Sequence, residues 1–157
     1  MEQEFMLASI RRQILTEEER LRVCNELTAQ YGLTLSGGQI RELAERRFAA
    51  LQDTGRVEFG EGILEKLIRA FCDSPYISQG EYMETLLALQ DAFYYFKNES
   101  LERLPDDELI DYMKQVFDGR AQGSLEYLFG TSLEDLCREA RGGERSKAED
   151  DAQYGEE

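Results

Sequence analysis

The sequence predicts an all-α protein, a compact bundle of about six helices in antiparallel or orthogonal packing. Apolar residues recur every three to four positions along almost the whole chain, which is the period of an amphipathic helix. Capping residues, glycines and prolines divide this pattern into segments joined by short connections, as in helix bundles. With 157 residues, of which 41% are hydrophobic, the chain can bury one core. We therefore predict a single helical domain over residues 1–141.

The first helix is expected over residues 7–31, where apolar side chains fall on one side. Gly32 is expected to end it, because glycine readily adopts the left-handed backbone conformation that closes a helix. Thr16 is followed three residues later by Glu19, which resembles a capping box. The alternative is therefore two helices with a break near Leu15.

The second helix is expected to begin at Ser36, with Gln39 at the reciprocal position of a capping box, and to end at Gly55. Residues 35–39, Leu-Ser-Gly-Gly-Gln, match the signature loop of ABC-type ATPases letter for letter. That chemistry also needs a P-loop with its lysine, which the sequence lacks. The capping box explains Ser36 and Gln39 without any nucleotide.

The same region has the outline of a helix-turn-helix over residues 26–51. Arg41, Arg46 and Arg47 lie on its second helix, but Glu42 and Glu45 lie between them. A DNA-binding domain normally carries a clustered basic surface. We therefore do not expect this segment to bind DNA.

The third and fourth helices have distinct boundaries. The third is expected over residues 63–72 and ends at Asp73-Ser74-Pro75, because the residue before a proline avoids helical geometry. Ser78 and Glu81 form a further capping-box pattern that opens the fourth helix. An apolar seam with alternating spacings of four and three residues follows, a pattern typical of packed helices: Tyr82, Leu86, Leu89, Phe93 and Phe96.

The last helices carry weaker signals. Pro105 followed by three acidic residues predicts a helix start, and Gly119 predicts its end. A final helical segment is expected over residues 124–141, split near Gly130. Residues 142–157 are polar and charged with few apolar side chains, so we expect a disordered acidic tail.

The charge limits the classes of partner. Thirty-three acidic against eighteen basic residues give a net charge of −15, and residues 61–141 alone contribute −9. Because nucleic-acid binding depends on clustered cations at phosphates, we expect no nucleic-acid ligand. A mimic of nucleic acid, with regularly spaced surface carboxylates, stays an alternative. No apolar stretch approaches the roughly 20 residues of a membrane span, and residues 1–4 are acidic where a signal peptide is basic, so we predict a cytoplasmic protein without membrane partners.

No catalytic, metal or cofactor site emerges from the sequence. The three cysteines, Cys24, Cys72 and Cys137, are far apart and are expected to be buried apolar side chains. The chain contains no histidine, which removes the usual partner of a nucleophilic thiol and of carboxylate-bridged iron. We expect no cofactor, and the enzyme question stays open with a preference for a non-enzyme.

An aromatic cluster is the first candidate for function. Tyr94 and Tyr95, close to Lys97, point away from the apolar seam of their helix, so we expect at least one of them to be exposed. Exposed tyrosines are enriched at protein interfaces, whereas a covering helix would bury them. The leading hypothesis is therefore a non-enzymatic protein-interaction module with an acidic, partly aromatic surface, which binds another protein or a copy of itself.

Two glycine-rich charged loops, residues 55–62 and 118–123, are the rival candidate. Arg56, Glu58, Glu61 and Arg120 offer charged groups on loops, where binding residues often lie. The rival hypothesis is a small-molecule-binding protein or enzyme whose site forms where the loops converge. Turn geometry explains the glycines equally well.

Several phrases of the sequence resemble an uncharacterised bacterial family of small proteins, a domain of unknown function from anaerobes. The phrases occupy residues 55–64 (GRVEFGEGIL), 67–76 (LIRAFCDSPY), 93–99 (FYYFKNE), 117–120 (FDGR) and 123–128 (GSLEYL). The resemblance extends over roughly residues 7–140. It implies a stand-alone bacterial cytoplasmic protein, and no activity, cofactor or site residue.

Overall fold

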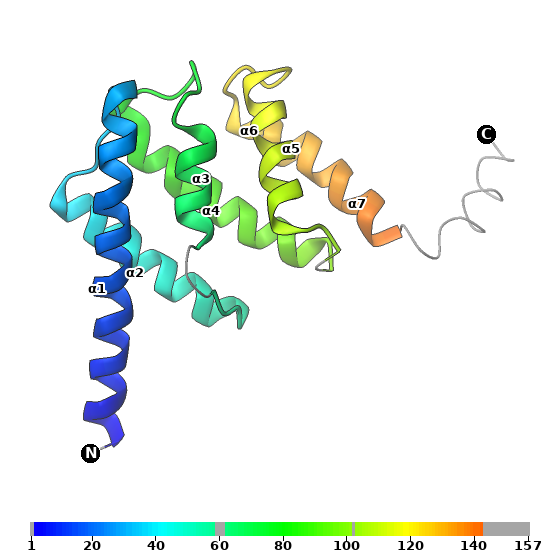
Figure 1. Ribbon diagram of the computed structural model, residues 1–157. Helices are drawn as coiled ribbons and strands as arrows, with labels where there is room; N and C mark the ends of the chain where they lie inside the picture. The colour runs from blue at the N-terminus through cyan, green and yellow to red at the C-terminus, as the bar shows by residue number, and fades with distance from the viewer. Residues whose placement is uncertain (1, 59–61, 102, 143–157) are drawn as a thin grey trace, which may run out of the picture. The chain divides into compact units, whose positions relative to one another are not determined.

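A computed structural model describes residues 2–58, 62–101 and 103–142, and these residues form helices and no strand (Figure 1). The all-α prediction is confirmed, with six helices of nine residues or more. The long helices are α1 (Glu2–Thr28), α2 (Gly37–Thr54), α3 (Ile63–Phe71), α4 (Tyr82–Glu99), α5 (Asp106–Asp118) and α7 (Glu134–Gly142), and α6 (Leu125–Tyr127) is a single turn. None of the described helices combines the length and apolar character needed to cross a bilayer.

Residue contacts divide the chain into two compact units, Met1–Asp91 and Ala92–Glu157. The boundary falls inside α4, so this helix belongs partly to each unit. The single domain over residues 1–141 stays a prediction. Of the predicted tail, residues 142–157, Gly142 is the last residue of α7, and residues 143–157 lie outside the described residues.

The first helix is longer and simpler than expected. It is unbroken from Glu2 to Thr28, and Thr16 lies inside it, so the alternative of a break near Leu15 is wrong. A 3₁₀ turn, Ala29–Tyr31, extends it to Gly32, which adopts the predicted left-handed conformation with φ 77°. A capping-box pattern does not by itself end the helix that precedes it. The helix continues through Thr16 and Glu19 because the apolar face of α1 continues on both sides of them.

The capping predictions had different outcomes in α2 and α4. The Gln39 amide donates to Ser36 Oγ at 3.2 Å, and the Ser36 amide donates to Gln39 Oε1 at 2.9 Å, which confirms the first capping box. Gly55 ends α2 with φ 67°. Ser78 makes no side-chain capping bond, because a 3₁₀ turn, Gln79–Glu81, precedes α4 and changes the geometry of its first turn.

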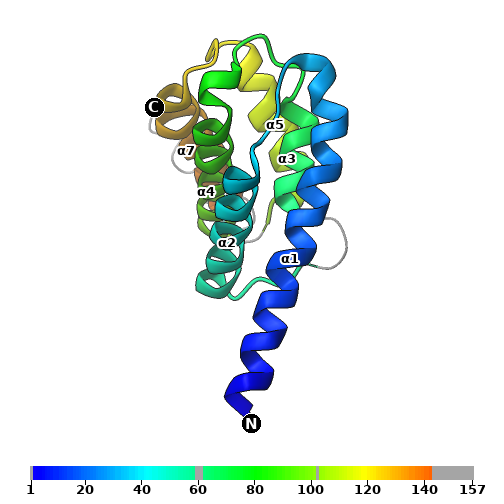
Figure 2. The ribbon, with the colours of Figure 1, turned by 90° about the vertical axis from the view of Figure 1, so that its left-hand side faces the viewer.

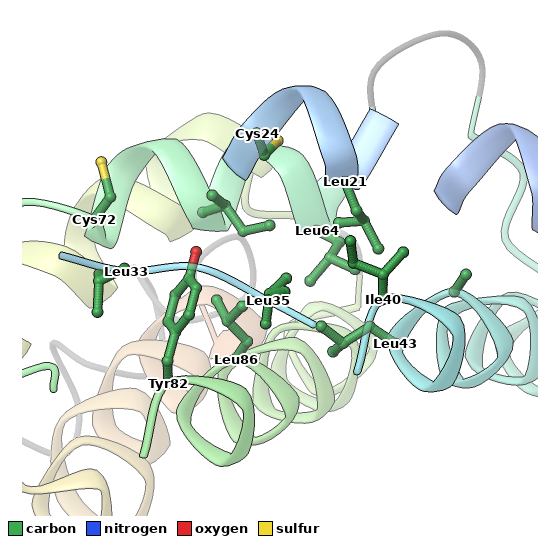
Figure 3. Close-up of a cluster of buried hydrophobic side chains, with 12 residues drawn as sticks. Leu21, Cys24, Leu33, Leu35, Ile40, Leu43, Leu64, Cys72, Tyr82 and Leu86 are labelled. Atoms are coloured by element: carbon green, nitrogen blue, oxygen red, sulfur yellow. The ribbon is translucent and has the colours of Figure 1, made fainter. Parts of the chain in front are cut away.

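The core of the first unit forms where α1, α2, α3 and the start of α4 meet (Figure 2; Figure 3). Leu21 and Cys24 from α1 face Leu64 from α3, while Tyr82 and Leu86 approach from the opposite side (Figure 3). The remaining buried members are Leu33, Leu35, Ile40, Leu43, Ala44, Ile68 and Cys72. The three-to-four residue spacing seen in the sequence therefore reports real buried faces.

The second unit contains the end of α4, α5, α6 and α7. Pro105 precedes α5 and Gly119 ends it, both as predicted. The expected split near Gly130 is instead a wide π-helical turn, Leu128–Leu133, that joins α6 to α7 without a break. Such a turn inserts one residue into the helix, so the apolar period shifts while the chain stays helical. The buried apolar side chains include Phe93, Leu109, Met113, Phe117, Leu128, Leu133 and Cys137.

Candidate functional site

A cleft of about 520 Å³ opens in the first unit, and arginine is its most frequent lining residue. Arg12 and Arg20 come from α1, Arg47 from α2, and Arg56 from the segment after α2. The other lining residues are Gln13, Thr16, Phe48, Leu51, Gln52, Val57 and Glu58. A volume of this size falls in the range of small-molecule sites, roughly 300–1,000 Å³.

Helix geometry explains why these arginines meet. Arg12 and Arg20 are eight residues apart, slightly more than two turns, so they project from neighbouring positions on one face of α1. α2 packs against α1, and Arg47 lies on its contact side. Gly55 ends α2 in a left-handed conformation, which turns the chain so that Arg56 reaches the same cleft.

Arg47 is the central cation of the site, and it is 7% exposed. Its Nη1 atom lies 3.4 Å from Glu17 Oε1, and its Nη2 atom lies 3.2 Å from Glu58 Oε1. Glu58 also accepts from Arg56 Nε at 3.0 Å and from the amide of Ile63, the first residue of α3, at 3.3 Å. These contacts tie α1, α2 and the start of α3 together, and loss of the Glu58 carboxylate would leave the buried Arg47 cation uncompensated.

Gly62 makes room for this network. A Cβ atom on Gly62 would lie 2.7 Å from Glu58 Oε1 and 3.0 Å from Arg47 Nη2, closer than van der Waals contact allows. The Glu58 carboxylate cannot simply move away, because two arginines and a backbone amide hold it. The glycine at this position therefore serves close packing and not backbone flexibility.

Two buried carboxyl groups lie beneath the arginines. Glu17 is 1% and Glu65 is 2% exposed, and their carboxyl groups lie next to each other in the core. Carboxylates only accept hydrogen bonds, so a hydrogen bond between these two groups requires a proton on one of them. Burial, together with the bond to Glu65, raises the pKa of Glu17 to about 9, although Arg47 and Arg20 lower it. Glu65 Oε1 also accepts from the Gly62 amide at 3.2 Å, which caps the start of α3.

The local charge is opposite to that of the whole chain. The cleft and the acids below it contain four arginines and three glutamates, Glu17, Glu58 and Glu65, of which Glu17 is protonated at neutral pH. The local net charge is therefore +2, in a protein of net charge −15. Arg12 is exposed and forms no ion pair with any described residue, and Arg20 lies 3.9 Å from the protonated Glu17. These two guanidinium groups remain available to an anion entering the cleft.

The structure brings together two of the predicted site residues, Arg56 and Glu58, in this cleft. Glu61 lies outside the described residues. Arg120, from the loop over residues 118–123, belongs to the second unit, where its Nη2 atom donates to Tyr112 Oη at 3.0 Å and contacts Ser132 Oγ at 3.3 Å. Convergence of the two loops therefore stays a prediction.

The two aromatic candidates, Tyr94 and Tyr95, differ in their exposure. Tyr94 is buried, so it is not part of a surface for a partner, and its ring packs at 5.6 Å, edge to face, on Phe93. Tyr95 is 53% exposed, as predicted for at least one of the two. Lys97 is also buried, since its ammonium group donates to the Leu104 carbonyl and pairs with Asp106 at 3.0 Å. Lys97 therefore closes the loop before α5 and is not a surface contact residue.

Sequence reasoning missed Arg12, Arg20 and Arg47, and also the carboxyl pair Glu17 and Glu65. The spacing of Arg12 and Arg20 was a usable signal, because it places two cations on one helix face. Glu17 lies in the apolar register of α1, between Ile14 and Leu21, where a charged residue is unusual. The pairing of these groups across three helices has no local sequence signal.

The comparison with known proteins identifies a family and no activity. Residues 20–146 match a family of unknown function (DUF6323). The matched range contains Arg20, Arg47, Arg56, Glu58 and Glu65, and it covers most of the chain. No curated protein and no solved structure matches the chain. The chain therefore belongs to the DUF6323 family, whose function is unknown.

Proposed function

We propose that this protein binds a small anionic molecule, an organic acid or a phosphate ester, in the arginine-lined cleft of its first unit. One observation carries the proposal: a concentration of guanidinium groups with a local charge of +2 in a concave site on a chain of charge −15. Guanidinium groups bind carboxylate and phosphate oxygens in a bidentate manner, with charge-assisted hydrogen bonds.

The residues that line the cleft indicate the chemical character of the ligand. Phe48, Leu51 and Val57 contribute apolar surface to the same cleft, and Gln13 and Gln52 contribute amides. Binding sites for small molecules combine apolar walls with a few placed polar groups in this way. A ligand with an anionic head and an apolar body fits this lining better than a bare inorganic ion.

The buried network supports the proposal by preorganising the cations. Arg47 and Arg56 are fixed by Glu58, so their side chains lose little additional freedom on binding. The protonated state of Glu17 leaves Arg20 without a strong anionic partner. The site therefore carries positive charge that its own carboxylates do not neutralise.

Isothermal titration calorimetry with four probes tests the proposal: inorganic phosphate, citrate, an aromatic carboxylate and a nucleoside monophosphate. We expect at least one organic anion to bind, with affinity that weakens as salt rises. Arg12→Gln and Arg20→Gln should each weaken binding by about tenfold or more, since a charged hydrogen bond is worth roughly 1.5–3 kcal/mol. Arg46→Gln is the matched control, because Arg46 is an exposed neighbour of Arg47 outside the cleft. The proposal fails if no probe binds, or if Arg46→Gln weakens binding as much as the cleft variants.

A protein-interaction module is the second candidate, and the exposed ring of Tyr95 supports it. Its T-shaped contact with Phe96, with centroids 4.9 Å apart, holds the ring in a fixed orientation for a partner. Tyr95→Ala would then abolish capture of a partner without changing anion binding in the cleft.

We also propose that the protein is cytoplasmic. Its three cysteines form no disulfide, and reducing compartments keep thiols in this state.

A further inference from the structure

The geometry of α1 points to a second function: we propose that the first half of this helix pairs with the same segment of a second copy of the chain in antiparallel orientation. This surface is separate from the arginine-lined cleft. The pairing uses the α1 face that carries Leu7, Ile10 and Ile14.

The first half of α1 has an apolar face that the rest of the unit leaves open. In both views α1 extends beyond α2 and α3 at its N-terminal end (Figure 1; Figure 2). Met6 and Leu7 are 63% and 61% exposed, and Ile10 and Ile14 are only partly buried. A shallow groove of about 370 Å³ continues this face toward α2. Its apolar lining residues are Leu7, Ile10, Ile14 and Leu15, and its charged lining residues are Arg11, Glu18, Arg41 and Glu45.

A helical extension of this kind would gain stability from an external contact. Helices shorter than about 12–15 residues are marginal in water, and most helical stability comes from packing of the apolar face. Residues 3–9 are all exposed, so no part of the described chain supplies that packing. A second helix on the apolar face would supply it.

The spacing of the apolar residues is that of a coiled-coil seam. Leu7, Ile10 and Ile14 occupy alternating positions three and four residues apart, and the same register continues into the buried residues Glu17 and Leu21. Such a seam packs side by side with a second helix of the same pattern. One apolar face therefore runs along α1. Its second half packs in the core, and its first half is exposed.

The charges select a copy of the same helix and its direction. Glu4 and Arg11 are seven residues apart, so they lie on the same flank of the seam, one acidic and one basic. In an antiparallel pair each flank faces the identical flank of the other helix, which places Glu4 beside Arg11 of the second copy, twice by symmetry. With Leu7 opposite Ile10 of the second copy, the same register brings both charge pairs together. In a parallel pair this flank would face Met6 and Gln13, and neither charge would gain a partner.

Glu4 and Arg11 are free for this role, since neither forms an ion pair with any described residue of its own chain. The contact is short, because 14 residues of helix extend only about 21 Å. We therefore expect a reversible dimer of the weak class, which buries less than roughly 1,200 Å².

Sedimentation equilibrium of the full chain, from about 10 µM to 1 mM, measures this dimer directly. The wild-type chain should show a monomer–dimer equilibrium in this range. Leu7→Glu should raise the dissociation constant at least about tenfold, because two leucines per dimer lose their burial. Val23→Glu is the matched control, since Val23 lies on the same helix and is also 63% exposed. A monomer throughout the range, or an equal effect of Val23→Glu, would overturn the proposal.

Charge reversal tests the antiparallel register. Glu4→Arg should weaken the dimer roughly tenfold, because two attractive pairs become two repulsive ones. The double variant with Glu4→Arg and Arg11→Glu should restore the wild-type dissociation constant, since it exchanges the charges and keeps the pairing. Unchanged dimerisation of Glu4→Arg would overturn the antiparallel arrangement. Circular dichroism of each variant at low concentration verifies that the helical content is retained.

Discussion

Replacement of Glu17 by glutamine should change how stability depends on pH. In the folded chain burial and the bond to Glu65 raise the pKa of Glu17 from 4.5 to about 9. Between these two values the folded state holds a proton that the unfolded state releases. The favourable contribution is therefore complete below about pH 4.5 and is lost as pH rises toward 9.

The size of the effect follows from the same shift. Each pH unit within the window costs up to about 1.4 kcal/mol of unfolding free energy. From pH 5.5 to pH 8.5 the loss attributable to Glu17 is on the order of 2–4 kcal/mol, a large part of an ordinary domain's stability. Glutamine keeps the shape of the side chain, and its amide donates to Glu65 at every pH, so the variant should lose this part of the slope.

Urea unfolding followed by circular dichroism at 222 nm, repeated at several pH values between 5.5 and 9, measures the slope. The variant should gain stability relative to the wild-type chain as pH rises, steadily between about pH 5.5 and 8 and less steeply as pH approaches 9. Glu19→Gln is the matched control, because Glu19 lies on the same helix with a side chain that is 74% exposed. Its difference from wild type should stay nearly constant. The proton on Glu17 is refuted if the two variants show the same pH dependence.

Four further predictions concern packing, capping, backbone geometry and the thiols. Gly62→Ala should destabilise the chain by roughly 1–3 kcal/mol, because its Cβ would lie 2.7 Å from a pinned Glu58 oxygen, and urea unfolding measures the loss. Ser36→Ala should cost about 1 kcal/mol in the same assay through loss of the capping box of α2. Gln122→Gly should stabilise the chain by about 1 kcal/mol in thermal unfolding, since Gln122 has φ 49° and glycine adopts that conformation without strain. Burial raises the pKa of the Cys24 and Cys137 thiols to about 11. We therefore expect the buried thiols to react with a disulfide reagent at pH 8 only after unfolding. Fast reaction of the folded chain would contradict this.

The sequence pattern identifies part of the candidate site, through its charged glycine-rich loops. Arg56 and Glu58 were identified because they lie in a glycine-rich loop, and they do line the cleft. Tyr94 was expected outside the core because it is off the main apolar seam, yet its ring is buried. The position of a residue relative to the apolar seam shows which way its side chain points from its own helix. Its burial also depends on every other element that packs against that side of the helix.

The sequence by itself determined the helices of this protein and most of their ends. The apolar period fixed which faces are buried, and Ser36, Gly55 and Gly119 fixed boundaries, because these signals act within a few residues. Only the tertiary structure decided that Arg20, Arg47 and Arg56 share one cleft and that the carboxyl groups of Glu17 and Glu65 are buried next to each other. Charge–charge contacts and desolvation depend on distance in space, and helix packing sets those distances between residues far apart in the chain.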